Sequence, residues 1–397
     1  MGCDVTLTLR GAASSITGFE TYRRSAVVRV RAPSSQPLHP ADAALVHHAH
    51  EAEQASSSGF RQVVVIGEPT AKLSAFDSVA VLPKSFDYLS DGDIIGIQPQ
   101  LRRVRSLYRK SSRHNSFLVT ERCNHNCLMC SQPPRNVDDL WLLDEISRAL
   151  PLVPSDAASF SFTGGEPLSD WREFTDVLLQ CRSILPNTAI HVLTNGRAFA
   201  RTEVVDAWAA VAHPQLMAGI PLYASVDHMH DYVVQARNAF DETVLGILKL
   251  KERRQRVEVR VVLHAITAPI LEETCRWLSR NLPFVDHVAL MGMENTGFAI
   301  ANDEELWMDP LDYGQQLRCG LDLLAKAGMN VSVYNLPRCV LPASVWPYAI
   351  QSISDWKNGF VDSCEACVER PNCSGFFTTG RPRYSRGINP ILAPGRV

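Results

Sequence analysis

The sequence predicts an α/β protein built around a partial barrel of six βα units, with a small β domain before it and a cysteine-rich extension after it. From about residue 116 to 328, short β-branched and aromatic runs alternate with helical patterns, as in parallel sheets whose strands are joined by helices. Upstream, β-type runs occur without that alternation, and downstream four cysteines lie within residues 339–373. A chain of 397 residues has room for two or three folding units.

The small β domain is expected within residues 1–110. Its strand candidates are the apolar runs Val27 to Val30, Val63 to Ile66, Val79 to Leu82 and Ile94 to Ile97. The stretch 32–59 is rich in Pro, Ala, Ser and His, a composition that predicts a mobile segment. The barrel is expected over residues 111–328, and the extension, which ends in a flexible tail, over 329–397.

Six strands are predicted in the barrel, namely Phe117 to Thr120, Ser159 to Thr163, Ala189 to Leu193, Gln215 to Tyr223, Val257 to His264 and His287 to Met291. Helices are predicted near residues 138–150, 170–183, 202–211, 240–254, 270–280 and 309–327. Six units are fewer than the eight of a closed α/β barrel, so the barrel is incomplete. In such folds the chemistry lies on loops at the carboxyl ends of the strands.

The first of these strands leads into three cysteines with the spacing C-x3-C-x2-C, which are Cys123, Cys127 and Cys130. A 4Fe-4S cluster has four irons, so three cysteine ligands leave one iron free, and S-adenosylmethionine (SAM) can bind it through its amino and carboxylate groups. A structural zinc site would need a fourth ligand. His125 is the nearest imidazole, but its place inside the loop does not match the usual zinc spacings.

The second strand ends in Gly164-Gly165-Glu166-Pro167. Paired glycines allow a backbone to approach a ligand closely, and a neighbouring carboxylate can receive the SAM ammonium group. Alone, these residues are compatible with an ordinary turn. They follow the cysteine loop by about 35 residues, and both motifs close a strand, so together they indicate a SAM site.

The two motifs resemble those of the radical SAM superfamily, and the resemblance covers roughly residues 116–300. It implies a partial (βα)6 radical SAM barrel in which Cys123, Cys127 and Cys130 ligate the cluster. It also implies that the residues Gly164, Gly165 and Glu166 hold SAM.

Three further residues occupy places where this superfamily contacts the SAM ribose and carboxylate. Asn195 follows the third strand, and Ser225 and Asp227 follow the fourth. Turn chemistry alone also explains the Asn-Gly pair that begins at Asn195. The chain departs from the family at Met129, where many members carry an aromatic residue that flanks the adenine.

A narrower resemblance is to the His-Xaa-Ser-system radical SAM maturases of C type. It rests on residues 116–134, which include Cys-Leu-Met-Cys-Ser-Gln-Pro-Pro, and on residues 352–358. It implies an enzyme that cleaves SAM reductively to a 5'-deoxyadenosyl radical and, by hydrogen-atom abstraction of an oxidoreductase-like kind, modifies a ribosomally synthesised peptide with His-Xaa-Ser repeats. The implied partners are that peptide, an electron donor of the flavodoxin or ferredoxin type and a partner maturase. The β domain of residues 1–110 carries none of the SAM motifs, so it is a candidate for recognition of the peptide, although it could equally serve only to cap the open barrel.

The second cysteine group consists of Cys339, Cys364, Cys367 and Cys373. Four thiolates suit zinc and iron-sulfur clusters equally well. The C-x2-C-x5-C part resembles the auxiliary-cluster pattern of peptide-modifying radical SAM enzymes, which favours one auxiliary 4Fe-4S cluster. That pattern continues with further cysteines, whereas this chain has none after Cys373. Whether Cys339 is a ligand is left open.

Two other functions are compatible with the sequence: a radical SAM enzyme that acts on RNA or a small molecule, and a zinc-binding scaffold without catalysis. Six basic residues lie close together, namely Arg102, Arg103, Arg105, Arg109, Lys110 and Arg113. Aromatic residues for base stacking are sparse there, and the formal net charge is -3, so nucleic acid is not the favoured partner. No apolar run approaches the ~18 residues of a membrane span, and a secretory signal is not recognised, which predicts a cytoplasmic location without a membrane partner.

Overall fold

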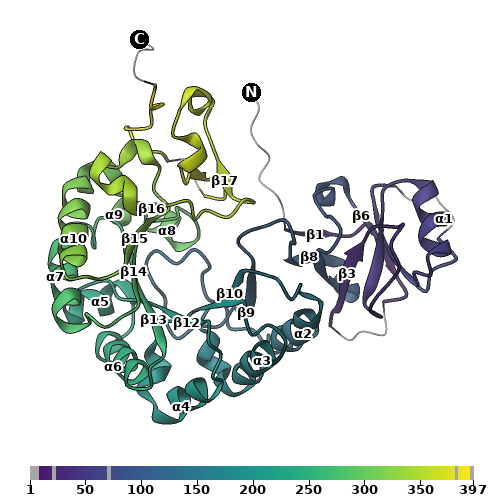
Figure 1. The fold of residues 1–397 in the computed structure, drawn as a ribbon, viewed down its shortest axis with the longest axis horizontal. Coiled ribbons are helices and arrows are strands. Elements are labelled where there is room, and N and C mark those ends of the chain that lie inside the picture. The colour runs from purple at the N-terminus through teal and green to yellow at the C-terminus, as the bar shows by residue number, and fades with distance from the viewer. Residues whose placement is uncertain (1–8, 20–23, 69–72, 381–382, 394–397) are drawn as a thin grey trace.

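The computed structural model describes residues 9–19, 24–68, 73–380 and 383–393. It has an N-terminal β domain, a central parallel sheet surrounded by helices, and a C-terminal extension beside the last strands of that sheet (Figure 1). This arrangement confirms the predicted α/β fold class. Among the described residues, no helix is both long enough and apolar enough to cross a membrane.

The N-terminal domain is an eight-stranded sheet with the order β1-β8-β7-β3-β4-β5-β6-β2. Its strands are β1 (Arg10–Ala12), β2 (Ser15–Thr17), β3 (Ala26–Arg31), β4 (Asp42–Val46), β5 (Gln62–Ile66), β6 (Ser78–Leu82), β7 (Ile94–Gln98) and β8 (Arg103–Tyr108). Strands β1 and β2 lie at opposite ends of this order although two residues separate them. The sheet therefore curls on itself, and Ala13 and Ser14 donate backbone hydrogen bonds of 2.8 Å to Arg102 and Val81 on its two sides.

The stretch 32–59 is not a mobile segment throughout. Residues 42–46 form the buried strand β4, and helix α1 (Ala49–Ser57) packs its buried alanines, Ala52 and Ala55, in one cluster with residues of β4, β5 and β6. The carboxylate of Asp42 accepts hydrogen bonds from the guanidinium of Arg29 at 2.8 and 3.0 Å and from two backbone amides. The prediction of mobility is thus wrong for residues 42–57, because the polar composition hid an internal strand.

The central sheet has eight parallel strands in the order β16-β15-β14-β13-β12-β11-β10-β9. All six predicted strands are present, as β9 (Ser116–Thr120), β10 (Ser159–Gly164), β11 (Ala189–Leu193), β12 (Leu216–Pro221), β13 (Arg256–Leu263) and β14 (His287–Gly292). Two short strands follow, β15 (Val331–Tyr334) and β16 (Ala349–Ile350). They continue the sheet into the region that the sequence assigned to the extension.

Helices cover the outer side of this curved sheet (Figure 1). They are α2 (Trp141–Ala149), α3 (Trp171–Ile184), α4 (Thr202–Ala210), α6 (Ala239–Glu252), α7 (Leu271–Asn281) and α10 (Gly314–Lys326). Helices α5 (Asp227–Val234), α8 (Phe298–Ala301) and α9 (Asp303–Leu306) instead contribute residues to an apolar cluster around Met129. In β13, Val257, Val259 and Val261 pack into the large apolar core shared with the helices. Glu258 and Arg260 alternate with them and so face the opposite side, the inside of the curve.

The N-terminal β domain and the barrel are joined through helix α2. The Arg105 side chain of β8 pairs with the buried carboxylate of Glu145 and lies 5.1 Å from the Trp141 ring centroid. A Cβ at Gly96 of β7 would come within 2.5 Å of the Glu145 carboxylate, so this carboxylate packs directly on the glycine and would have to shift for any larger residue. The domain is therefore fixed to the barrel by specific side-chain contacts.

The C-terminal extension contains short 3-10 turns and a two-stranded sheet of β17 (Asn358–Gly359) and β18 (Phe376–Phe377). Its last described part is tied down, because Ser385 and Arg386 bind the carboxylate of Asp309. The predicted flexible tail is thus wrong for these residues, while residues 394–397 lie outside the described part of the chain.

Candidate functional site

The three cysteines of the first group lie in the loop that follows β9. All three are partly buried free thiols. Burial raises the pKa of Cys123 to about 11, and burial together with the neighbouring Cys130 and Cys123 raises that of Cys127 further. The structure therefore brings the three sulfurs into one neighbourhood in which a thiolate needs a cation to stabilise it.

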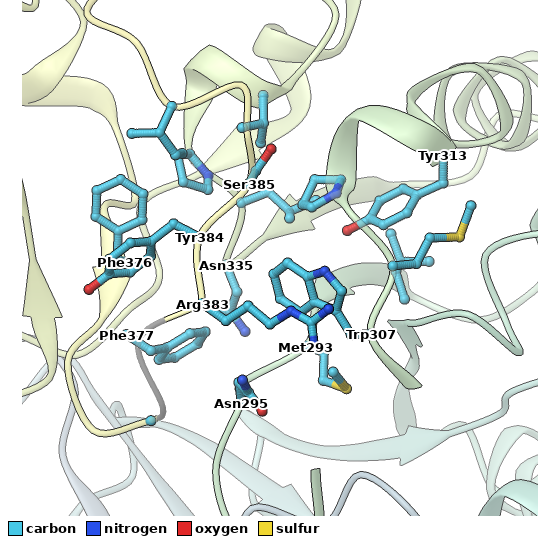
Figure 2. Close-up of a pocket in the computed structure, with 18 of the residues that line it drawn as sticks. Met293, Asn295, Trp307, Tyr313, Asn335, Phe376, Phe377, Arg383, Tyr384 and Ser385 are labelled. Carbon is cyan, nitrogen blue, oxygen red and sulfur yellow. The ribbon is translucent and has the colours of Figure 1, made fainter. Parts of the chain in front are cut away.

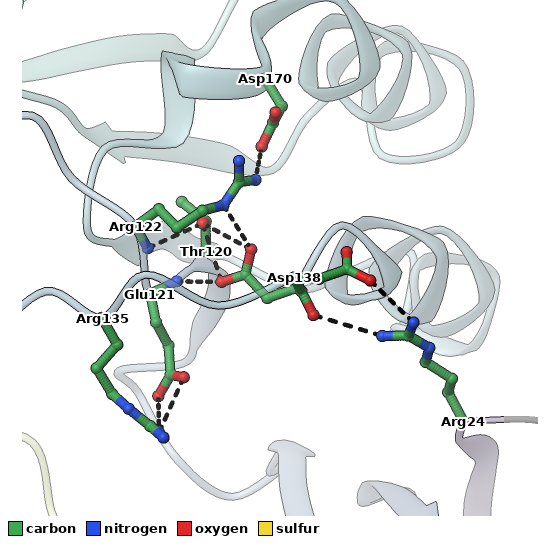
Figure 3. Close-up of polar contacts among 8 residues, drawn as sticks. Arg24, Thr120, Glu121, Arg122, Arg135, Asp138 and Asp170 are labelled. Carbon is green, nitrogen blue, oxygen red and sulfur yellow. Dashed lines mark hydrogen bonds and ion pairs between the residues drawn. The ribbon is translucent and has the colours of Figure 1, made fainter.

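A polar network fixes the chain just before these cysteines (Figure 3). The buried carboxylate of Asp139 accepts hydrogen bonds from the Thr120 hydroxyl at 3.0 Å, the Glu121 backbone amide at 2.5 Å and the Arg122 guanidinium at 3.0 Å. Arg122 also pairs with Asp170, which precedes α3. Sequence reasoning missed both aspartates, since neither belongs to a motif.

The paired glycines allow β10 to approach the cysteine loop closely. Gly165 donates a backbone hydrogen bond of 2.7 Å to Thr120, and the next amide donates one of 2.8 Å to Arg122. A Cβ would come within 2.2 Å of the Thr120 oxygen at Gly164 and 1.9 Å of the Arg122 oxygen at Gly165. Both glycines are thus required for the packing of two strand ends, whether or not they also contact SAM.

Glu166 links the same loop to the next one. It is 3% exposed and accepts hydrogen bonds from the Leu168 amide at 2.9 Å, the Thr194 hydroxyl at 2.7 Å and the Asn195 amide at 2.7 Å. Burial raises its pKa. The carboxylate therefore already connects the ends of β10 and β11, and its contact with the SAM ammonium stays a prediction.

The other predicted SAM residues occupy two different settings. The Asn195 side chain donates a hydrogen bond of 2.6 Å to Asn124 inside the cysteine loop. Ser225 instead donates one of 3.0 Å to Glu273 on α7, and Asp227 is exposed at the start of α5. The structure thus places Asn195 against the cysteine loop, whereas Ser225 and Asp227 are engaged or exposed elsewhere at the end of β12.

Two residues within the cysteine loop have buried surroundings. Met129 packs with Tyr223 and Val233 in a small apolar cluster. His125 is 2% exposed, and burial together with the nearby Arg197 guanidinium lowers its pKa to about 3. An Arg197 nitrogen lies 3.3 Å from the His125 Nε2, so this imidazole is neutral and its Nε2 accepts.

The four cysteines of the second group line one cavity of about 320 Å³. Burial and the nearby thiols of Cys373 and Cys364 raise the pKa of Cys339. Backbone amides of Arg338 and Gly375 donate to the Cys373 sulfur at 3.4 Å, and the Ile391 amide donates to Cys367 at 3.4 Å. Amide donors around sulfur stabilise its thiolate form.

Neither group has its sulfurs drawn together around one point. Within the part of the chain that the structure describes, no three His, Cys, Asp or Glu side chains are placed to hold one metal ion. In a 4Fe-4S cluster each cysteine binds a different iron, which requires a wider arrangement of sulfurs than a single ion does. What both groups do offer is cysteine thiols, the ligands that an iron-sulfur cluster takes.

A larger cavity of about 710 Å³ lies between the ends of β13, β14 and β15 and the segment around β18 (Figure 2). Its walls are mainly apolar and aromatic. Met293 and Leu306 line it and also contact the Met129 cluster beside the first cysteines. Pro337 and Phe376 line both this cavity and the one formed by the second cysteines. The cavity therefore lies between the two cysteine groups.

Comparison with protein families gives one match. Residues 117–278 match the model of the Radical SAM superfamily, a span that contains the first cysteine group and the glycine pair. These residues form a radical SAM domain. The cofactors of such a domain are a 4Fe-4S cluster and SAM, and the three free cysteines after β9 have the thiol chemistry that the cluster requires.

Several solved structures are similar to this chain at low identity. SuiB from Streptococcus suis, bound to S-adenosylmethionine, is 15% identical with a TM-score of 0.45, over 55% of this chain and 50% of SuiB. anSMEcpe with bound AdoMet is 17% identical with a TM-score of 0.42, over 55% and 63% of the two chains. A radical SAM methyltransferase from Sphaerobacter thermophilus is 16% identical with a TM-score of 0.44, over 62% and 74%. The matched part thus spans about half the length of SuiB. A search of curated proteins found no match.

Proposed function

We propose that this protein is a radical SAM enzyme that modifies a ribosomally synthesised peptide after translation. The observation that supports this most is the large cavity between the two cysteine groups, at the carboxyl ends of the strands. It is lined mainly by apolar and aromatic side chains, and it adjoins the cluster of Met129. The resemblance of residues 116–134 and 352–358 to His-Xaa-Ser-system maturases suggests the peptide type.

In this proposal Cys123, Cys127 and Cys130 hold the radical cluster. When bound, the cluster and SAM supply a 5'-deoxyadenosyl radical that can take a hydrogen atom from an unactivated carbon. The chain contributes position, because the hydrogen bonds of Glu166 and Asn195 hold the loops after β10 and β11 against the cysteine loop.

The walls of the large cavity would protect a radical from water and from side reactions. Trp307, Phe376 and Phe377 supply aromatic surface there, and Arg383 lies over the Trp307 ring at 4.7 Å while it pairs with Asp303. An apolar cavity whose cation is already paired suits a peptide side chain better than a phosphate backbone. This favours a peptide over RNA as the substrate.

The six basic residues between Arg102 and Arg113 do not favour RNA over a peptide as the substrate. Arg105 is paired with Glu145, and Arg109 is paired with Asp355 of the extension at 2.8 Å. Both cations therefore form ion pairs within the protein, Arg105 with helix α2 and Arg109 with the C-terminal extension. The exposed members are Arg102, Arg103, Lys110 and Arg113.

We also propose that Cys339, Cys364, Cys367 and Cys373 hold one auxiliary 4Fe-4S cluster. The cavity that all four line and the amide donors directed at two of the sulfurs support this. A cluster with four cysteine ligands would pass electrons or shape the substrate cavity, since Pro337 and Phe376 separate the two cavities. A zinc ion is the alternative occupant.

Recognition of the peptide by residues 1–110 stays a proposal with less support. The two ends of the sheet order are taken by β1 and β2, and one short segment runs from one to the other. An extended peptide would therefore find little unpaired strand edge to which it could add. The proposed enzyme function also includes two protein partners, an electron donor of the flavodoxin or ferredoxin type and a partner maturase.

The test is to purify the protein without oxygen, reconstitute it with iron and sulfide, and measure 5'-deoxyadenosine after reduction in the presence of SAM. We expect release by the unaltered protein and by Cys319→Ala, a half-buried thiol outside both groups, but none by Cys127→Ala. About eight irons per chain would support two clusters, and about four would leave only the radical cluster. Four irons with one zinc would establish zinc in the extension. Undiminished release by Cys127→Ala would contradict the assignment.

Mass spectrometry tests the substrate. The peptide encoded beside the gene would be coexpressed with the unaltered protein and with Cys127→Ala. A mass change that requires an intact Cys127 would support peptide modification. SAM cleavage without any change in the peptide would support a different substrate.

A further inference from the structure

We propose that Asn295 recognises a carboxamide group of the substrate within the large cavity, a specificity that rests on the proposed function and narrows it. The relevant chemistry is an N–H donor and a C=O acceptor side by side. Two sources could present it: the primary amide of a substrate Asn or Gln, or the N–H and C=O of one residue in an extended main chain.

Asn295 has an unusual environment for a buried amide. It follows β14, lines the cavity and is 7% exposed, yet neither its Nδ2 nor its Oδ1 has a hydrogen-bond partner among the described residues. Buried polar atoms are nearly always paired, because an unpaired one loses its water without compensation. Asn335 lines the same cavity, but its Oδ1 accepts from Ser352 at 3.0 Å.

The neighbours of Asn295 within the described part of the chain offer its side chain no hydrogen-bond partner. Figure 2 shows the Asn295 side chain between the Phe377 ring on its left and Met293 on its right, with the Trp307 ring above. The amide lies just beneath the cavity wall, so a ligand has to displace an apolar neighbour to pair with it. A carboxylate or an ammonium ion could satisfy only one of the two amide atoms, whereas a carboxamide satisfies both.

The position of Asn295 is suited to a role in substrate recognition. The Phe298 amide, three residues later, donates a hydrogen bond of 2.8 Å to the Cys130 carbonyl. A Cβ at Gly297 would come within 2.4 Å of that same oxygen, so the loop is packed tightly on the cysteine loop. A substrate amide held by Asn295 therefore lies close to the proposed site of hydrogen abstraction. The rest of the substrate residue can pack against the aromatic walls of the cavity.

The first experiment uses small probes on the anaerobically purified full-length protein, with binding followed by ligand-observed NMR. One pair is 4-methylpentanamide and methyl 4-methylpentanoate, which represent a side-chain amide and its ester. The other pair is N-acetyl-leucine N-methylamide and its analogue with oxygen in place of the leucine N–H, which represent a main chain. We expect one amide to bind about tenfold more tightly than its partner. The pair that discriminates identifies the source, and equal binding within both pairs would overturn the proposal.

The second experiment replaces the amide by a side chain of similar size. Asn295→Leu should lose the preference for the amide probe, and its melting temperature without ligand should rise by about 2 °C because an unpaired buried amide is removed. The matched control is Asn115→Leu, since Asn115 is 8% exposed but makes three hydrogen bonds, so its melting temperature should fall. A fall for Asn295→Leu, with the amide preference retained, would assign Asn295 to structure.

If Asn295→Leu fails to fold, the probe pairs on the unaltered protein still decide the question. Release of 5'-deoxyadenosine by the unaltered protein tests the proposed function separately. Its presence without discrimination between amide and ester would contradict only the role of Asn295. Its absence together with amide binding would contradict the radical chemistry and leave an amide-binding site.

Discussion

At the scale of single residues, Glu166 has a role that its motif does not reveal. The Gly-Gly-Glu-Pro turn identifies the residue from the sequence. Its partners Thr194 and Asn195 lie 28 and 29 residues away, after the next strand, and only the folded sheet brings them to the carboxylate. Sequence reasoning could therefore find the residue but not the hydrogen bonds that connect two loops.

Replacement of Glu166 by alanine distinguishes these two roles. Three donors lose their acceptor in Glu166→Ala, so the free energy of unfolding without SAM should fall by about 3 kcal/mol. Glu252→Ala, at an exposed carboxylate, should change it by less than about 0.5 kcal/mol. Chemical denaturation of the SAM-free proteins measures both. An unchanged stability of Glu166→Ala combined with loss of SAM binding would instead support direct contact with the SAM ammonium.

At the scale of elements, strong periodic patterns were predicted well and short ones were not. All six predicted barrel strands exist, because each has an apolar run bounded by turn residues. Strands β15 and β16, of four and two residues, are too short to give such a pattern. Strand β4 was missed because the Pro, Ala and His residues around it suggested a linker. Helix α5 was not predicted because its eight residues are too few for a clear helical pattern.

Asp42 of β4 makes this element sensitive to acid. Although burial alone would raise its pKa, the hydrogen bonds from Arg29 and from the amides of Leu38 and His39 lower it below the ordinary 3.8. A lowered carboxyl pKa stabilises the fold fully above the ordinary value, and this stabilisation is lost as the pH falls toward the folded-state pKa.

Asp42→Asn should therefore cost about 2 kcal/mol at pH 7 and show a smaller decrease in stability between pH 5 and 3 than the unaltered protein. Urea unfolding across this range measures the difference. Asp77→Asn, at an exposed pair with Arg61, serves as the control and should change the stability little. Parallel acid profiles for Asp42→Asn and the unaltered protein would show that Asp42 does not contribute.

At the scale of the whole molecule, the union of the two larger parts depends on contacts that no local pattern predicts. From the sequence alone, Glu145 would be expected to be an exposed carboxylate on a helix. In the structure it is buried against Gly96 and paired with Arg105 of the other domain. Removal of residues 1–110 would leave this carboxylate without its cation, so a deletion cannot separate recognition of a peptide from loss of folding.

A double replacement tests this connection. Arg105→Met should cost about 3 to 5 kcal/mol, because it leaves Glu145 buried without a partner. Adding Glu145→Met should restore most of that loss, since two apolar chains then fill the same space. Arg253→Met, at a surface pair with Asp206, should cost no more than about 1 kcal/mol. Thermal denaturation compares the unaltered protein with Arg105→Met, Glu145→Met, the double variant and Arg253→Met. Additive effects of the Arg105 and Glu145 replacements would show that the two residues do not interact.

The way in which the N-terminal sheet curls on itself has a consequence for synthesis on the ribosome. Residues 10–17 emerge before the rest of this sheet, yet β2 pairs with β6 and β1 with β8, whose last residue is Tyr108. Strands β1 and β2 therefore cannot pair until β8 and β6 have been synthesised. Until β1 and β2 have paired, the edges of β6 and β8 that they will cover stay unpaired. Nascent chains stalled before Tyr108 leaves the exit tunnel should accordingly bind chaperones that chains stalled well after it no longer bind.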